Sequence, residues 1–96
     1  MPAETKRLHA TIEGRVQGVG FRYFVVNMAE ELNLTGWVRN LANGDVEITV
    51  EGNTKDLERL LSHVRTGPPS SYVNNVSLDW SAAENTFTSF SIRSTY

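Results

Sequence analysis

The 96-residue sequence contains no cysteine, which excludes disulfide bonds, a thiol nucleophile and any metal site built on thiolates. The absence fits a reducing compartment, and we expect the protein in the cytoplasm. The sequence also lacks long apolar runs, so neither a secretory signal nor a membrane-spanning segment is expected. The net charge of −2 argues against general binding to nucleic acid.

The length corresponds to one small domain, and no repeat or composition shift marks a second one. We therefore expect a single domain over residues 1–96. Residues 1–5 carry no pattern and are expected to form a loose arm. No surplus apolar stripe is visible along the chain, so a monomer is expected.

The most distinctive stretch is Gly14–Arg22, with the sequence GRVQGVGFR. Its three glycines free the backbone for conformations that a side chain opposes. N–H groups that converge just before a helix attract an anion, and the helix dipole adds to that attraction. Arg22 adds a planar fork suited to two phosphate oxygens. The stretch fits a phosphate cradle, but its spacing fits a plain glycine-rich turn equally well.

Two better-known glycine loops are absent. A Walker loop counted from Gly14 would need its second glycine at Val19, and no lysine follows. The dinucleotide fingerprint fits Gly18 and Gly20, but its third glycine position is occupied by Tyr23. Nucleotide binding through either motif is therefore excluded.

Charge is unevenly distributed along the chain. Basic residues are in excess between Lys6 and Arg22, and acidic residues are in excess between Asp45 and Glu58. An acidic protein with a basic patch around its glycine-rich stretch suits a small anionic ligand.

The spacing of apolar residues predicts the order of the elements. Alternation indicates strands over residues 8–13, 36–41, 46–51 and 76–80, and helical spacing indicates helices over residues 21–32 and 57–64. Asn53 or Thr54 can cap the second helix, and Asp56 suits its first turn. Asn43-Gly44 is a strong hairpin signal between the second and third strands. A last strand contains Phe90 and Ile92. This order predicts an α+β fold, the ferredoxin-like βαββαβ sandwich with an extra C-terminal strand, in which two helices cover one face of a mainly antiparallel sheet.

Two side chains within these elements need comment. Asn40 lies near the end of a strand, on the parity that carries Val38 toward the interior. A partly buried amide needs hydrogen-bond partners, although the local sequence favours an asparagine that starts the turn. Trp80 is expected to be a core or sheet residue.

Two segments closely resemble the acylphosphatase family. GRVQGVGFR satisfies the first family signature, Gly-x-Val-Gln-Gly-Val-x-Phe/Tyr-Arg, at every fixed position. The second signature runs Gly-aromatic-small-x-Asn, three residues, Gly-x-Val, five residues, Gly, and the segment from Gly36 to Gly52 satisfies it as well. The resemblance extends from about residue 6 to residue 93.

The resemblance implies hydrolysis of the carboxyl–phosphate bond of acyl phosphates, to a carboxylate and inorganic phosphate, without a metal or cofactor. Arg22 would bind the phosphate and Asn40 would hold the attacking water, which reverses the local interpretation of Asn40. The main-chain N–H groups that would share the phosphate are those of Gln17, Gly18, Val19, Gly20, Phe21 and Arg22. A loose phosphoryl-transfer transition state needs mainly positioning and charge stabilisation, which suits this residue set. Gly20 occupies the variable position of the signature and adds freedom to the loop.

Three alternatives remain. An RNA-binding module shares the element order, but the strand over residues 46–51 is acidic and has no aromatic platform. A regulatory domain that holds phosphate without turnover would not need Asn40. The N-terminal domain of the larger hydrogenase-maturation carbamoyltransferase carries a similar loop, so carbamoyl phosphate stays open as a substrate.

Overall fold

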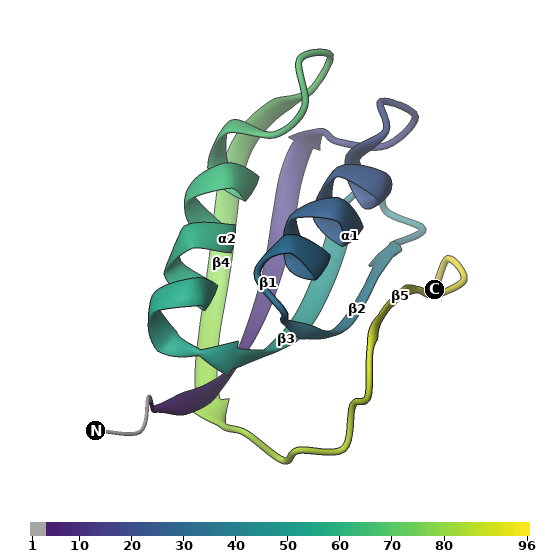
Figure 1. Ribbon diagram of the computed structural model, residues 1–96. Coiled ribbons are helices and arrows are strands. Elements are labelled where there is room, and N and C mark those ends of the chain that lie inside the picture. The colour runs from purple at the N-terminus through teal and green to yellow at the C-terminus, as the bar shows by residue number, and fades with distance from the viewer. Residues whose placement is uncertain (1–3) are drawn as a thin grey trace.

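The computed structural model describes residues 4–96, which form five strands and two helices (Figure 1). In chain order these are β1 (Thr5–Arg15), α1 (Phe21–Glu31), β2 (Thr35–Asn40), β3 (Val46–Asn53), α2 (Thr54–Thr66), β4 (Tyr72–Ala82) and β5 (Phe90–Ile92). The order confirms the predicted ferredoxin-like α+β fold, including its extra C-terminal strand. No helix within the described range is long and apolar enough to cross a membrane.

The strands form one sheet in the order β4-β1-β3-β2-β5. Only the pairing of β2 with β5 is parallel, and the other three pairings are antiparallel. Both helices lie on the same face of this sheet, with α1 over the β2 side and α2 over the β4 side (Figure 1). The sheet thus has one helix-covered face and one open face.

Alternating apolar side chains of the central strands form the core beneath the helices. The strand residues that contribute to it and are almost fully buried are Leu8, Ala10, Ile12, Val38, Val46, Ile48 and Val50. From the helices come Phe21, Val25, Ala29, Leu57, Leu60 and Val64. The buried positions match the period-2 and helical patterns of the sequence, because each element turns one apolar face toward the other layer.

One expectation needs correction and another is confirmed. The loose arm predicted for residues 1–5 does not include Thr5, which begins β1, or Glu4, whose carbonyl accepts hydrogen bonds from the N–H and hydroxyl of Thr54. The rest of that arm lies outside the described residues. Trp80 does lie in the sheet, but it is 40 % exposed because β4 is an edge strand.

Glu51 of β3 is a buried carboxylate on the open face of the sheet and only 3 % exposed. It accepts a hydrogen bond of 2.7 Å from Nε of Arg7 and two more from the main-chain N–H groups of Glu84 and Asn85. Glu51 therefore connects β1 to the segment between β4 and β5. Burial raises the pKa of this carboxyl, but the hydrogen bonds, first that of the Glu84 N–H and then that of Arg7, lower it by more, so the pKa lies below its ordinary value.

A carboxyl whose pKa is lowered by folding stabilises the folded state above its unfolded pKa, about 4.3 for Glu, and loses that contribution as the pH falls through the folded pKa. We predict that Glu51→Gln lowers the free energy of unfolding by about 1–3 kcal/mol at pH 7. The difference from wild type should shrink below about pH 4. Urea unfolding at pH 7 and pH 3 measures it, with the exposed Glu58→Gln as the matched control. An equal difference at both pH values would contradict the role assigned to the ionised carboxylate.

Gly14 lies where β1 and β4 approach each other closely, at a bulge in their pairing. Its φ is +132°, and a Cβ placed on it would lie 2.1 Å from the main-chain oxygen of Tyr72. A side chain here therefore meets backbone, which cannot turn aside as a flexible side chain can.

We predict that Gly14→Ala lowers the free energy of unfolding by at least ~2 kcal/mol more than Gly44→Ala, since a positive φ alone costs about 1–2 kcal/mol. Gly44 is the suitable control, because its φ is also positive at +101° but nothing lies within 4 Å of its added Cβ. Chemical denaturation of both variants tests this, and equal destabilisation would show that the close approach to Tyr72 is unimportant.

Candidate active site

The register of the sheet brings the C-terminal ends of β1 and β2 to the same end of the sheet. In β3, Val46 pairs with Ile12 of β1 on one side and with Asn40 of β2 on the other. Neighbouring strands lie about 4.8 Å apart, so Asn40 is roughly 10 Å across the sheet from Ile12. The glycine-rich loop leaves β1 only a few residues after Ile12. The two signature segments are therefore neighbours in space.

The loop between β1 and α1 has the backbone shape that its glycines permit. Gly18 and Gly20 both have left-handed φ values, +73° and +78°. Gly20 is the N-cap of α1 and provides no side chain to cap it. Glycine takes this conformation without strain, so the freedom noted at the variable signature position serves a defined turn.

The main-chain N–H groups of this loop are free. Within residues 4–96, no protein acceptor receives a hydrogen bond from the N–H groups of Gln17, Gly18, Val19 or Gly20. The first turn of α1 adds the N–H groups of Phe21 and Arg22, which precede the first helical hydrogen bond, from the Phe24 N–H to the Gly20 carbonyl. A run of free N–H groups at a helix N-terminus is an anion-binding arrangement.

Arg22 lies in the first turn of α1 and is half-buried. Among the residues that the structure describes, no carboxylate forms an ion pair with its guanidinium. Its charge is therefore available to an anion held by the adjacent N–H groups.

Asn40 ends β2 on the helix-covered face, as the parity with Val38 predicts. Its side-chain oxygen Oδ1 is buried and has no hydrogen-bond partner among residues 4–96. Its main-chain carbonyl accepts a hydrogen bond of 3.1 Å from the N–H of Tyr96. A buried amide oxygen without a partner is costly and calls for an explanation. Asn40 therefore lies in the strand, and its Oδ1 makes no hydrogen bond to the turn that follows within residues 4–96.

Gln17 joins the two signature segments through its side chain. Its Nε2 donates to the carbonyls of Leu41 at 2.7 Å and Asp45 at 2.8 Å, both in the β2–β3 hairpin. From the sequence alone only a main-chain role is predicted for Gln17, and this side-chain link is not. Its fixed place in the first signature was the available signal.

The C-terminal segment also holds the β2–β3 hairpin, through hydrogen bonds to β2 and to Ala42, and the sequence alone does not predict this role. The N–H of Arg93 donates to Val38, and the N–H of Ala42 donates to the carbonyl of Tyr96. The guanidinium of Arg39 lies over the rings of both Trp37 and Tyr96, 4.7 and 4.2 Å from their centroids. Stacking of this kind stabilises the position of the chain end beside β2.

Two of the five acidic residues between positions 45 and 58, Glu47 and Glu51, are paired with basic side chains on the open face. The Glu47 carboxylate accepts a hydrogen bond of 2.6 Å from Nε of Arg39, and its other oxygen lies 2.7 Å from Nε2 of His9. Burial raises the pKa of the Glu47 carboxyl, but the hydrogen bonds with His9 and Arg39 outweigh burial, and the pKa lies below its ordinary value. Glu47 is therefore a neutralised, structural acid, and the free positive charge of Arg22 lies on the other face.

This end of the sheet can hold a small oxyanion against main-chain N–H groups and a guanidinium, with an unpartnered carboxamide oxygen on a strand nearby. The described residues contain no group of three or more His, Cys, Asp or Glu side chains that could hold a metal ion. Fold and site together define a small α+β protein with an anion-binding arrangement at one end of its sheet.

Comparison with known proteins identifies the family. The acylphosphatase family model matches residues 8–92. The acylphosphatase of Salinibacter ruber is 48 % identical over 88 residues, which are 92 % of this chain and 93 % of that one. The crystal structure of acylphosphatase from Bacillus subtilis has a TM-score of 0.89 and 40 % identity, and the match covers 92 % of this chain and 98 % of that chain. The chain belongs to the acylphosphatase family and is a hydrolase of acyl phosphates.

A longer protein also contains this fold. In the crystal structure of full-length HypF in the phosphate- and nucleotide-bound form, a region 34 % identical matches 99 % of this chain with a TM-score of 0.88. The match covers only 13 % of that chain. The likeness therefore concerns one part of a much larger protein.

We predict that Gln17→Leu lowers kcat for benzoyl phosphate by about 10-fold or more, because a small displacement between loop and hairpin is costly in catalysis. Inhibition by inorganic phosphate should change little, since the free N–H groups of the loop remain. Steady-state kinetics with phosphate as inhibitor measures both quantities. An unchanged kcat would show that the Gln17 side chain does not position the hairpin for the reaction.

Proposed function

We propose that Arg22 and Asn40 are the catalytic residues of this acylphosphatase. Arg22 binds the phosphoryl group together with the main-chain N–H groups of Gln17, Gly18, Val19, Gly20, Phe21 and Arg22. Asn40 accepts a hydrogen bond from the attacking water through Oδ1. We also propose that residues 1–96 form one domain and that the protein works as a monomer in the cytoplasm.

One observation carries the proposal more than any other: Oδ1 of Asn40 is buried without a hydrogen-bond partner among residues 4–96. A group left unsatisfied in a folded protein often serves function rather than stability. A water molecule that donates a hydrogen bond to this oxygen would give it the missing partner. The Gln17 side chain ties the hairpin that follows Asn40 to the loop whose N–H groups are free.

The reaction then needs no covalent intermediate with the protein. The water oxygen forms a bond to phosphorus while the bond between phosphorus and the acyl oxygen breaks, and the electron pair of that bond leaves with the carboxylate. One water proton passes to a phosphoryl oxygen, so that an acyl phosphate dianion and water give a carboxylate and H2PO4−. Charge on the equatorial phosphoryl oxygens is stabilised by Arg22 and the main-chain N–H groups. A carboxylate is a good leaving group, so a neutral amide suffices to direct the water.

The roles of Arg22 and Asn40 are tested by hydrolysis of benzoyl phosphate in the presence of a chelator. We expect metal-independent turnover by the wild type. Arg22→Ala and Asn40→Ala should each lower kcat by at least ~10²-fold, the scale of a lost transition-state donor or positioning group. Arg22→Lys should lower kcat as well, because the point charge of an ammonium group does not replace the planar guanidinium, which can bind two phosphate oxygens at once.

Matched controls are Arg59→Ala and Asn27→Ala, which remove an exposed guanidinium and an exposed amide from the helices. Both should keep wild-type kinetics. Rapid turnover by Asn40→Ala would contradict the water-positioning role of Asn40, and loss of activity with chelator would show that a metal ion takes part.

The monomeric state is tested separately, by light scattering of the protein as it elutes from a size-exclusion column, which measures its mass.

A further inference from the structure

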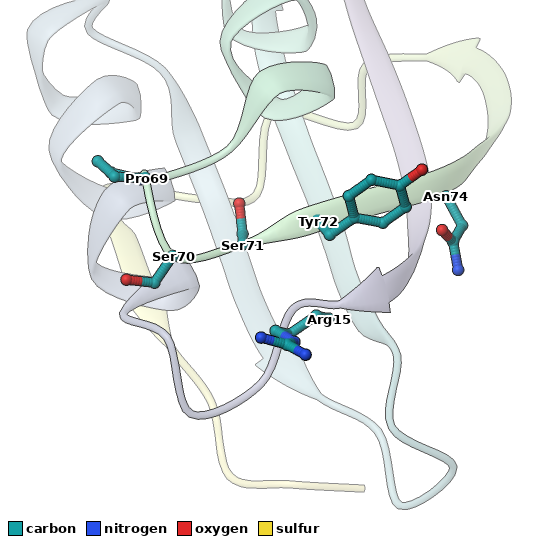
Figure 2. Close-up of a pocket in the computed structure, with 6 residues that line it drawn as sticks. All are labelled: Arg15, Pro69, Ser70, Ser71, Tyr72 and Asn74. Atoms are coloured by element: carbon teal, nitrogen blue, oxygen red, sulfur yellow. The ribbon is translucent and has the colours of Figure 1, made fainter.

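A pocket of about 740 Å³ lies beside the glycine-rich loop, and no role has been assigned to it so far. Its lining comes from two segments, the end of β1 and the chain that leads from α2 into β4 (Figure 2). The lining residues are Arg15, Pro69, Ser70, Ser71, Tyr72 and Asn74.

Two features place this pocket near the phosphate cradle, one a connection along the chain and the other a close approach between neighbouring elements. Arg15 directly precedes the loop that carries the free N–H groups. On the other side, Gly67 at the end of α2 lies so close to Phe21, the first residue of α1, that an added Cβ would be 2.9 Å from its ring. A substrate whose phosphate lies on the N–H groups therefore has the pocket within reach of its other end.

The lining is polar and carries one positive charge. Ser70, Ser71 and Asn74 offer hydroxyl and amide groups, and Figure 2 shows the Arg15 side chain across the opening from the segment that holds the serines. Within residues 4–96 no carboxylate forms an ion pair with Arg15. An exposed guanidinium without a protein partner in a polar pocket suits a ligand that carries an anionic group.

The order of the strands places the pocket and Asn40 on opposite sides of β1. Asn40 belongs to β2, which lies beyond β3 on one side of β1, and Tyr72 and Asn74 belong to β4 on the other side. Phosphoryl transfer keeps the attacking and leaving oxygens roughly in line. A water held by Asn40 therefore directs the leaving acyl group toward β4, which is the side of the pocket.

We propose that this pocket binds the acyl group of the substrate, and that Arg15 makes the enzyme prefer acyl phosphates whose acyl group carries a second anionic group. The proposal deepens the function proposed above and rests on the roles of Arg22 and Asn40.

The test compares two substrates of the same shape, 4-carboxybenzoyl phosphate and its neutral isostere 4-carbamoylbenzoyl phosphate. Wild-type kcat/KM should be higher for the carboxylate. Arg15→Gln should lower the ratio of the two kcat/KM values by about 5-fold, the scale of one exposed ion pair. Arg15→Lys should keep part of the preference, and added salt should weaken it in the wild type. The control Arg59→Gln removes an exposed arginine outside the pocket and should leave the ratio unchanged.

An equal loss of kcat/KM for both substrates in Arg15→Gln would show that Arg15 binds the phosphoryl group, and would overturn the proposal. An unchanged ratio would overturn it as well. Failure of the catalytic proposal looks different: Arg22→Ala or Asn40→Ala would then hydrolyse the neutral substrate rapidly, whatever the ratio measured for Arg15 variants.

Discussion

The antiparallel pairing of β3 with both β1 and β2 is the constraint on which the site depends. It sets Ile12 and Asn40 on either side of Val46, so that the loop after β1 and the hairpin after β2 leave the sheet at one end. A shift of one residue in either register would turn Asn40 to the open face, because side chains alternate along a strand. The buried row of Val46, Ile48 and Val50 opposes such a shift, since it would expose the core side of β3. The position of the site is therefore a consequence of core packing.

Most of the architecture could be predicted from the sequence, because strong local patterns agreed with the final fold. Alternating apolar residues marked the central strands, and Asn43-Gly44 marked the hairpin, where the Asn43 side chain accepts a hydrogen bond from the Asp45 N–H. Asn53 caps α2 by accepting from the Lys55 N–H. The first and last residues of the elements were predicted less accurately. β1 begins at Thr5, earlier than the alternation suggested, because its first residues pair with the end of β3 and do not bury apolar side chains.

The candidate site was predicted in part, and what was missed depends on contacts between distant residues. The parity of Asn40 with Val38 could be read from the sequence, but its lack of a partner depends on every group around it. The side-chain bonds of Gln17 join positions 24 and 28 residues apart, and no local pattern reports them. The polar C-terminal segment had no apolar period to interpret. Its place beside β2 comes from main-chain hydrogen bonds and from the guanidinium of Arg39, which lies over the rings of Trp37 and Tyr96.

The two helices show how stability and function are separated in so small a protein. At α2 the Asn53 side chain satisfies one of the free N–H groups of the first turn, which typically adds ~1 kcal/mol to stability. At α1 the corresponding residue is Gly20, which has no side chain to do so. An Asn or Ser there would compete with any anion for the same N–H groups, and its side chain would also have to tolerate a φ of +78°. The first turn of α1 lacks the stability that a capping side chain gives, and the burial of Phe21 and Val25 against the sheet offsets this loss. The helix can therefore leave its first N–H groups open to a substrate without losing its place in the fold.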